Sequence, residues 1–276
     1  MNFKDKTVVI TGGSEGVGAA AARLFADAGA NLMLVARGRR KLEAIAEELR
    51  DKTRVEIFTM DVADADACVD VFRKTEFEFG RIDILVNNAG FHRRGPFESV
   101  PAEDHGVMVD VNLRAPVMLT SIALPYIKQQ GGGAIVNVGS LAGRQPLPGQ
   151  VTYSAAKSGL RTFTYALAEE LRGTNVKVAL VSPGPLDTSF IMDNLDVVAD
   201  LTMSQPISTA EEVARVVVDI CSNRKREVAI PLSTAVLSRI IALMPWLRRL
   251  VQPVLERKGA KVKQRLQAER EQAAIE

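Results

Sequence analysis

The chain has 276 residues, of which 47% are hydrophobic and 25% are charged, and its formal net charge is +2. This balance excludes an intrinsically disordered chain and gives no sign of a nucleic-acid-binding protein. The two cysteines exclude a disulfide scaffold, and the two histidines, far from a cysteine pair, indicate no metal site.

Neither a targeting segment nor a membrane-spanning segment is expected. The first residues contain only a short apolar run, which is typical of neither a signal peptide nor a transit peptide. No stretch of about 20 residues is free of charge in the way that a spanning helix needs. The nearest approach, residues 229–247, is interrupted by Arg239, Pro231 and Pro245. We therefore expect a cytoplasmic protein.

Short β-branched runs alternate with longer amphipathic stretches. The expected strands are residues 7–11, 31–36, 54–59, 82–86, 134–138, 176–181 and 227–231. Most are continuously apolar, which is typical of strands buried on both faces of a parallel sheet. The expected helices are residues 16–28, 39–50, 64–79, 103–130, 152–172 and 210–222. This alternation predicts an α/β protein with a Rossmann-type, doubly wound, seven-stranded parallel sheet and helices on both faces.

Residues typical of turns support these boundaries. Glycines at positions 29, 80, 131 and 173 follow four of the expected helices, where a C-terminal cap is expected. Ser208 or Thr209 caps the helix that begins at Ala210. No repeat or linker precedes residue 231, so we predict one catalytic domain over residues 1–231 and a helical extension over residues 232–276.

The first expected strand ends in a glycine-rich turn, Gly-Gly-Ser-Glu-Gly-Val-Gly over residues 12–18. Glycines permit a tight turn and close approach of the backbone to a ligand. The following helix offers free N–H groups and a partial positive charge. The turn therefore indicates a dinucleotide pyrophosphate site, and a glycine cluster of an ordinary α/β turn is the alternative.

Tyr153 and Lys157 stand four residues apart on an expected helix, so their side chains share one face. An ammonium about 4 Å away favours the phenolate by up to about 4 kcal/mol at an effective dielectric constant of about 20. We expect Lys157 to lower the pKa of Tyr153 and to let it exchange a proton with a substrate oxygen. A packing tyrosine beside a solvated lysine is the alternative, and Ser140 at a strand end argues against it.

The order of these motifs resembles the classical short-chain dehydrogenases/reductases. The turn Thr-Gly-x-x-x-Gly-x-Gly is carried by Thr11, Gly12, Gly16 and Gly18. The further matches, in chain order over residues 5–231, are Asp61-Val62, Asn87-Asn88-Ala89-Gly90, Asn112, Ser140, Tyr153-Ser154-Ala155-Ala156-Lys157, Pro183-Gly184-Pro185 and Thr188. The resemblance implies an NAD(P)-dependent oxidoreductase that forms a homodimer or homotetramer.

The resemblance also assigns roles. Tyr153 is the general acid/base, Lys157 lowers its pKa and binds the nicotinamide ribose, Ser140 hydrogen-bonds the reacting oxygen, and Asn112 supports a water-mediated proton relay. The implied cofactor contacts are Thr11, Gly12, Ser14, Gly16, Val17, Gly18, Arg37, Asp61, Val62, Asn88, Ala89, Gly90, Tyr153, Lys157, Pro183, Gly184, Leu186 and Thr188.

The end of the second strand bears on the choice of cofactor. An acid there selects NAD, whereas this chain has Ala36 followed by Arg37, which suits the 2′-phosphate of NADP. Glu15 in the glycine turn opposes a phosphate, and Arg39 and Arg40 could offset it. We expect NADP(H), with NAD(H) as the alternative.

The substrate is expected to meet residues 91–94, 141–151 and 186–207. The last segment is rich in large apolar residues, namely Phe190, Ile191, Met192, Leu195, Val197, Val198, Leu201 and Met203. It is typical either of an apolar lid, which would suit a lipophilic 3-oxoacyl, keto-sphingoid or steroid-like ketone, or of an ordinary amphipathic helix. We expect Arg93, Arg94 and Arg144 to be solvated loop charges rather than ligands of an anionic substrate, and His92 and His105 to be surface or capping residues.

The extension combines apolar and basic residues with the single tryptophan of the chain, Trp246. Residues 239–276 hold nine basic and four acidic residues and carry +5, which leaves −3 for the rest. This pattern is typical of an interfacial helix on the inner face of an anionic membrane. The competing interpretations are a helix that closes the pocket or one that packs on a partner subunit.

The leading function is an NADP(H)-dependent carbonyl reductase or alcohol dehydrogenase. Sugar-nucleotide epimerases form a second class, but they use a different glycine spacing and a longer substrate domain. A cofactor-binding membrane-associated or scaffolding protein with an idle site is the non-enzymatic alternative, and the complete set of Asn112, Ser140, Tyr153 and Lys157 argues against it.

Overall fold

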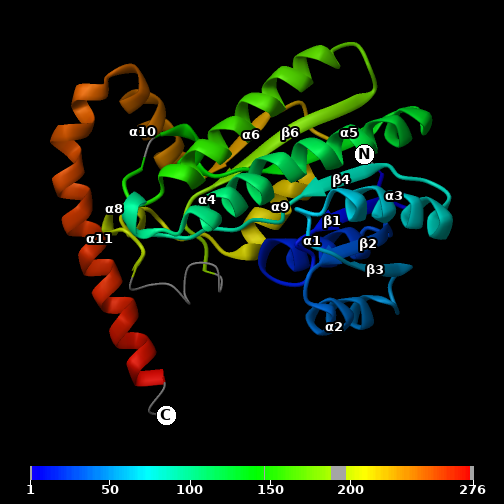
Figure 1. Ribbon diagram of the computed structural model, residues 1–276, viewed down its shortest axis with the longest axis horizontal. Coiled ribbons are helices and arrows are strands. Elements are labelled where there is room, and N and C mark those ends of the chain that lie inside the picture. Colours follow the sequence, from blue (N-terminus) through cyan, green and yellow to red (C-terminus); the bar gives the residue numbers. More distant parts are fainter. Residues whose placement is uncertain (1, 146, 188–196, 274–276) are drawn as a thin grey trace.

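Seven strands form one sheet in the computed structural model, which describes residues 2–145, 147–187 and 197–273 (Figure 1). The strands are β1 (Thr7–Thr11), β2 (Asn31–Ala36), β3 (Val55–Thr59), β4 (Ile84–Asn87), β5 (Gly133–Val138), β6 (Val176–Pro183) and β7 (Glu227–Ile230). Their order is β3-β2-β1-β4-β5-β6-β7, and every neighbouring pair is parallel. The predicted Rossmann-type, doubly wound sheet is confirmed.

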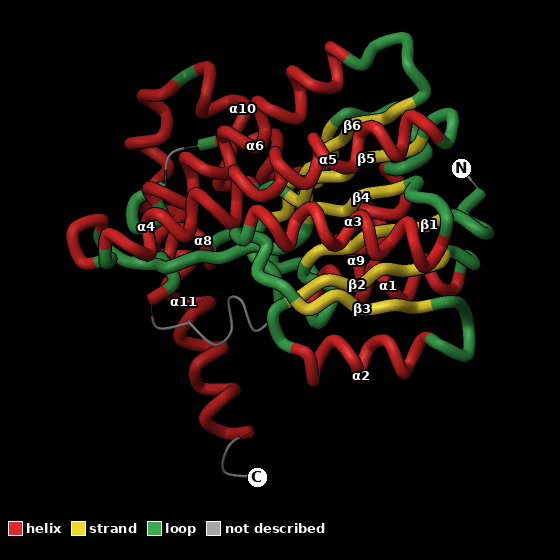
Figure 2. Tube along the Cα trace, turned by 45° about the vertical axis from the view of Figure 1, so that its right-hand side comes forward, coloured by secondary structure: helices red, strands yellow, loops and turns green. Residues whose placement is uncertain are grey.

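Helices cover both faces of this sheet (Figure 2). One face carries α1 (Gly16–Asp27), α2 (Arg39–Leu49) and α9 (Ala210–Ile220). The other face carries α3 (Ala65–Phe79), α5 (Ala115–Gln129) and α6 (Val151–Glu170). Shorter elements are α4 (Ala102–Val109), α8 (Asp200–Met203) and the 3-10 turns Phe97–Ser99 and Leu141–Arg144. The extension forms α10 (Leu232–Leu243) and α11 (Pro245–Ala273).

The core lies on both sides of the central strands. In β1, Val8 and Ile10 pack on the α1 face, whereas Val9 between them packs on the α3 face, and all three are fully buried. Alternate side chains of a strand point to opposite faces, so a strand covered on both sides needs apolar residues throughout. This is why the strands were recognisable as continuous apolar runs.

Local sequence signals begin and end the helices where they were expected. Thr209 forms a capping box with Glu212: its hydroxyl accepts from the Glu212 N–H at 3.1 Å, and its own N–H donates to the Glu212 carboxylate at 3.0 Å. Gly80 ends α3 in the left-handed conformation, with φ of 70°. The observed boundaries of strands and helices differ from the predicted ones by at most two residues.

The predicted helix over residues 103–130 is interrupted. Between α4 and α5 the chain forms one π-helical turn, Asp110–Arg114, with Asn112 at its centre. By length and composition alone, residues 102–129 could cross a membrane, although no membrane-spanning segment was expected. Leu119, Ala123 and Ile127 of α5 are buried against the sheet, so this segment is explained as a core helix.

The extension packs on the side of the molecule that carries α8. In Figure 1, α11 runs along α8 and continues past it toward the C-terminus. Gly259 permits this close crossing, because a Cβ at that position would lie 1.7 Å from the backbone oxygen of Asp200. Lys263 Nζ also donates to the backbone oxygen of Val198 at 3.1 Å, so α11 fixes the chain segment that enters α8.

Candidate active site

The carboxyl ends of the central strands meet at one cavity of about 210 Å³. β1 and β4 are neighbours from which the chain crosses to opposite sides, and such a switch point is where doubly wound sheets bind ligands. The lining includes Gly12, Glu15, Gly16, Val17, Asn88, Gly90, His92, Arg94, Val138 to Ala142, Tyr153, Lys157 and Pro183 to Leu186. One cavity therefore joins the glycine turn to the residues predicted to be catalytic.

Hydrogen bonds hold the glycine turn against the end of β4. The Thr11 hydroxyl accepts from the backbone N–H groups of Asn88 and Ala89 at 3.0 and 3.1 Å and donates to the Val86 oxygen at 3.3 Å. The Asn88 side-chain amide donates to the backbone oxygens of Thr11 and Gly12 at 3.0 and 3.2 Å. These residues thus shape the turn.

The glycine turn lies so close to α1 and Asn88 that side chains at positions 12 and 18 would not fit. A Cβ on Gly18 would lie 2.0 Å from the Gly12 oxygen, and a Cβ on Gly12 would lie 2.8 Å from the Asn88 amide nitrogen. Gly12 and Gly16 also have φ of 66° and 53°. The N-cap of α1 is Glu15, whose carboxylate is paired with Lys41 at 2.5 Å, and no acidic residue stands in the first turn, so the N–H groups of this N-terminus can face an anion. A dinucleotide fits this cradle.

Ser140, Tyr153 and Lys157 meet at the other end of the cavity. Ser140 follows β5, its hydroxyl accepts from the Ala142 N–H at 3.1 Å, and it also hydrogen-bonds Tyr153. Tyr153 and Lys157 occupy successive turns of α6 and are 8% and 4% exposed. Lys157 Nζ donates to the Val138 oxygen at 2.9 Å and lies 5.8 Å from the centre of the Tyr153 ring.

The protonation of this group is governed by burial. Burial raises the pKa of Tyr153 above 10, while the Ser140 hydrogen bond and the charge of Arg94 act in the opposite direction. Burial also lowers the pKa of Lys157 from 10.5 to about 8. Burial therefore sets the net direction of the Tyr153 pKa, and the lowering effect expected of Lys157 stays a prediction. At neutral pH the phenol is protonated, as a proton donor requires.

Two residues expected at the surface instead line the cavity. The imidazole of His92 stacks on Tyr153, with ring centres 4.1 Å apart and an interplanar angle of 12°. Burial lowers the pKa of His92 to about 3, so this ring is neutral. Arg94 lines the same cavity, and its charge acts on Tyr153. Only Arg93 matches its expectation, being exposed and 3.5 Å from Asp104.

His105 is also neither a cap nor a free surface residue. Its Nδ1 lies 2.7 Å from the Thr152 hydroxyl, and its Nε2 lies 3.2 Å from the backbone oxygen of Phe97. The ring stacks on that of Phe97 with centres 4.4 Å apart. It therefore ties α4 to the start of α6, immediately before Tyr153.

Asn112 is fully buried in the π-helical turn. Its amide donates to the backbone oxygens of Phe91 and Met108 at 2.6 and 2.9 Å. Its Oδ1 lies beside Gly90 and accepts no hydrogen bond from the residues that the structure describes. Single π-helical turns are frequent at functional sites, and this one directs a buried acceptor toward the cavity region.

The expected adenosine end lies at the carboxyl ends of β2 and β3. The Arg37 guanidinium is exposed and stands 3.8 Å from Asp61, while Arg39 is paired with Glu43 at 2.7 Å. Glu15, which was expected to repel a phosphate, is paired with Lys41 at 2.5 Å. Lys41, 26 positions away in the sequence, thus compensates Glu15 in place of the expected Arg39 and Arg40.

Five further residues that were expected to contact the cofactor lie within the described part of the chain. Pro183, Gly184 and Leu186 line the cavity, Val62 is buried beyond β3, and Ser14 is half-buried in the glycine turn. Thr188 and the apolar residues Phe190, Ile191, Met192 and Leu195 lie outside the described residues.

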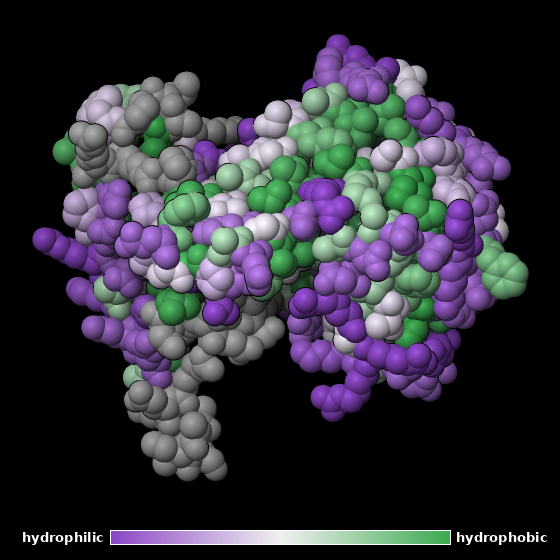
Figure 3. Space-filling model, viewed as in Figure 1, coloured by the Kyte–Doolittle hydropathy of each residue, from purple (hydrophilic) through white to green (hydrophobic). Residues whose placement is uncertain are grey.

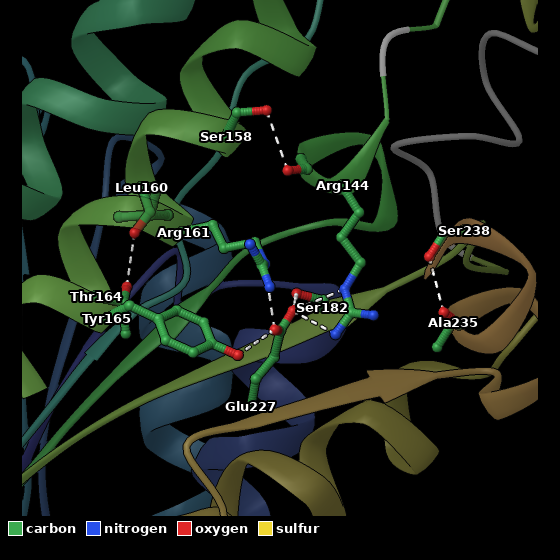
Figure 4. A network of polar contacts seen from close by, with 11 residues as sticks. Arg144, Ser158, Leu160, Arg161, Thr164, Tyr165, Ser182, Glu227, Ala235 and Ser238 are labelled. Carbon is green, nitrogen blue, oxygen red and sulfur yellow. Dashed lines mark hydrogen bonds and ion pairs between the residues drawn. The ribbon is translucent and has the colours of Figure 1, made fainter. Parts of the chain in front are cut away.

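Arg144 is not a solvated loop charge, and that expectation is wrong. Its side chain is 6% exposed and lies 2.8 Å from the carboxylate of Glu227, which is 2% exposed (Figure 4). Arg161 at 3.2 Å, the Tyr165 hydroxyl at 2.7 Å and the Ser182 hydroxyl at 2.7 Å complete the shell around Glu227. The network fixes the Ser140 turn and the helix of Tyr153 to β6 and β7.

The fold and the site together define an NAD(P)-dependent oxidoreductase of the Rossmann type. The sequence profile of the short chain dehydrogenase family matches residues 6–196. The chain therefore belongs to the short-chain dehydrogenase/reductase family. This match ends well before α10.

Named relatives are enzymes. The chain is 42% identical over 187 residues to sulfoacetaldehyde reductase 2 of Chromohalobacter salexigens, covering 67% of this chain and 74% of the relative. It is 32% identical over 228 residues to a 3-oxoacyl-[acyl-carrier-protein] reductase of Thermotoga maritima, covering 81% and 93%. The crystal structure of levodione reductase superimposes with a TM-score of 0.75 at 28% identity, covering 83% of this chain and 96% of that one.

Proposed function

We propose that the protein is an NADP(H)-dependent reductase of a lipophilic ketone or aldehyde. The observation that carries this proposal is the single cavity that joins the glycine turn to Ser140, Tyr153 and Lys157. A bound nicotinamide dinucleotide would supply the hydride that reaches the carbonyl carbon. Residues 12–18 would hold its pyrophosphate and Lys157 its nicotinamide ribose.

The chain's own residues handle the proton. Ser140 would hydrogen-bond the carbonyl oxygen, and Tyr153 would donate its phenolic proton to that oxygen as the carbon is reduced. The raised pKa of Tyr153 keeps the phenol protonated for this task. Asn112 Oδ1, a buried acceptor beside Gly90, would orient a water that resupplies the proton.

The preference for NADP(H) rests on three charges. Arg37 is available at the end of β2, and the pairing of Glu15 with Lys41 removes the negative charge that would oppose a 2′-phosphate. We expect Arg37→Ala to raise the KM for NADPH at least tenfold and to leave the KM for NADH unchanged, because a charged hydrogen bond is worth about 1.5–3 kcal/mol. Arg39→Ala is the matched control. Equal or better use of NADH by the unaltered enzyme would contradict the preference for NADP(H).

The apolar lining supports a lipophilic substrate. Leu141, Leu147 and Leu186 line the cavity beside Ser140. One relative is named for an acyl substrate, a 3-oxoacyl group. Loss of NADPH absorbance with a panel of ketones of graded size tests the proposal, and activity confined to small polar carbonyls would contradict the lipophilic assignment.

Exposed apolar side chains support a homodimer or homotetramer. Phe97, Val107, Val109 and Val151 are 57%, 39%, 40% and 51% exposed. Figure 3 shows hydrophobic residues gathered over the middle of the face that carries α4, α5 and α6. Light scattering coupled to size exclusion tests this, and a monomer at micromolar concentration would contradict it.

We also propose that the cytoplasmic enzyme contacts an anionic membrane through α10 and α11. Exposed apolar residues recur every four positions and so share a face: Leu232, Val236, Ile240 and Met244, and then Trp246, Leu250 and Val254. Basic residues follow on α11.

A flotation assay tests this contact. Binding to vesicles of phosphatidylcholine with phosphatidylglycerol should shift the fluorescence of Trp246, the only tryptophan of the chain, to shorter wavelength. Leu250→Glu should abolish flotation, whereas Phe77→Glu, at an exposed apolar residue of α3, should not. Equal flotation of both variants would contradict the proposal.

A further inference from the structure

A second cavity, of about 200 Å³, lies beneath the C-terminal extension. Its walls come mainly from α8, α10 and α11, with Gln145, Gln205 and Pro206 from adjoining segments. The apolar side chains that the three helices contribute are Leu201, Leu237, Ile241, Val251 and Leu255. Leu237 and Ile241 belong to α10, and Val251 and Leu255 to α11. The extension therefore builds most of a chamber that the dehydrogenase domain alone would lack.

Polar residues also line this chamber, namely Gln145, Ser204, Gln205, Ser233, Thr234, Ser238, Gln252 and Lys258. The Ser238 hydroxyl donates to the Ala235 oxygen at 2.9 Å, and the Ser204 hydroxyl donates to the Leu201 oxygen at 2.7 Å. Both hydroxyls thus donate to the backbone of their own segment and not to a ligand. The five apolar side chains from α8, α10 and α11 are the surfaces on which a hydrocarbon chain would pack.

Gln205 lines both cavities and so stands in the wall between them. Its Oε1 lies beside Gly184, which belongs to the wall of the catalytic cavity. This buried oxygen accepts no hydrogen bond from the described residues, so Gln205 places an unsatisfied acceptor in the wall that the two cavities share. Thr202, three residues earlier, lines the catalytic cavity and accepts from the Gln150 amide at 2.8 Å.

We propose that the second cavity is a subsite for the distal, apolar part of the carbonyl substrate. The reacting carbonyl of the substrate lies at Ser140 and Tyr153. The hydrocarbon chain of the substrate extends past Gln205 into the chamber between α8, α10 and α11. This inference rests on the proposed function and adds the substrate class: carbonyl compounds with an extended hydrocarbon chain. The close crossing at Gly259 holds α11 on α8, so the subsite is preformed.

A homologous series of 2-alkanones tests the subsite. From 2-butanone to 2-dodecanone, kcat/KM with NADPH should rise by up to about fourfold for each methylene that enters the chamber, the equivalent of about 0.8 kcal/mol. Leu255→Trp fills the chamber and should lower kcat/KM for 2-dodecanone at least tenfold while leaving 2-butanone unchanged. Val254→Trp, at the neighbouring position with its side chain 64% exposed, is the matched control and should change neither value.

A second variant and a second readout keep the test independent of folding and of turnover. Leu237→Trp fills the same chamber from α10 and should reproduce the effect. Binding of cis-parinaric acid, followed by its own fluorescence, should weaken at least tenfold in both filling variants and remain unchanged in Val254→Trp. If 2-butanone is reduced but neither chain length nor filling matters, the subsite is wrong. If no carbonyl is reduced yet parinaric acid binding follows these variants, the proposed function fails and the chamber stands.

Discussion

Lys157 carries a charge that the folded protein accommodates at a cost. It is 4% exposed, and burial lowers its pKa from 10.5 to about 8. The unfolded chain therefore holds this proton more tightly than the folded protein does. The difference between the two values corresponds to about 3 kcal/mol of destabilisation. The penalty is complete below pH 8, shrinks as the pH rises from 8 to 10.5, and is absent above that range.

Lys157→Met removes this penalty along with the hydrogen bond to the Val138 oxygen. We expect the variant to lose turnover and to differ from the wild type in free energy of unfolding in a pH-dependent way. The lost hydrogen bond offsets part of the gain by about 1 kcal/mol, but it contributes equally at every pH. The difference between variant and wild type should therefore fall by about 2 kcal/mol between pH 7 and pH 9.5.

Urea unfolding of both proteins at pH 7, 8, 9 and 9.5 measures this difference directly. Other groups that titrate at high pH are common to both proteins and cancel. If the two curves of unfolding free energy against pH are parallel, Lys157 keeps its ordinary pKa in the folded protein, and the lowered pKa is contradicted.

Two other substitutions test Arg144 and Arg94, which were expected in solvent but are enclosed by the fold. Glu227→Gln leaves the buried guanidinium of Arg144 without a counter-charge and should lower the free energy of unfolding by about 3 kcal/mol in urea titrations. A loss below about 1 kcal/mol would contradict the stabilising role of this ion pair. Arg94→Met should raise the pKa of Tyr153 and move the pH profile of alcohol oxidation to higher pH, since that direction needs the phenolate. The exposed Arg93→Met is the control, and equal profiles for the two variants would be the contrary result.

The parts of this structure that follow from local rules were predictable. A strand covered on both faces must be apolar throughout, and four residues on a helix place Tyr153 and Lys157 on one side. The glycine turn was recognisable because Gly18 lies so close to Gly12 that a side chain would not fit between them. Each of these signals is contained in a few consecutive residues.

What escaped prediction depends on residues that are distant in the sequence. Arg144 and Glu227 are separated by 83 positions, and Lys41 and Glu15 by 26. No local pattern indicates which loop cations fold inward, so Arg94 was assigned to solvent although it lines the cavity beside Tyr153. The direction of the Tyr153 pKa was missed for a related reason, because burial is a property of the assembled fold.

We propose that Tyr153 donates the proton in an NADPH-dependent carbonyl reduction. The most direct test compares the wild type with Tyr153→Phe in the oxidation of NADPH by a ketone that the wild type reduces, alongside fluorescence titration of NADPH binding. We expect the variant to bind NADPH as the wild type does and to lose about a thousandfold in kcat. A variant that binds NADPH and retains more than about a tenth of the wild-type rate would contradict it.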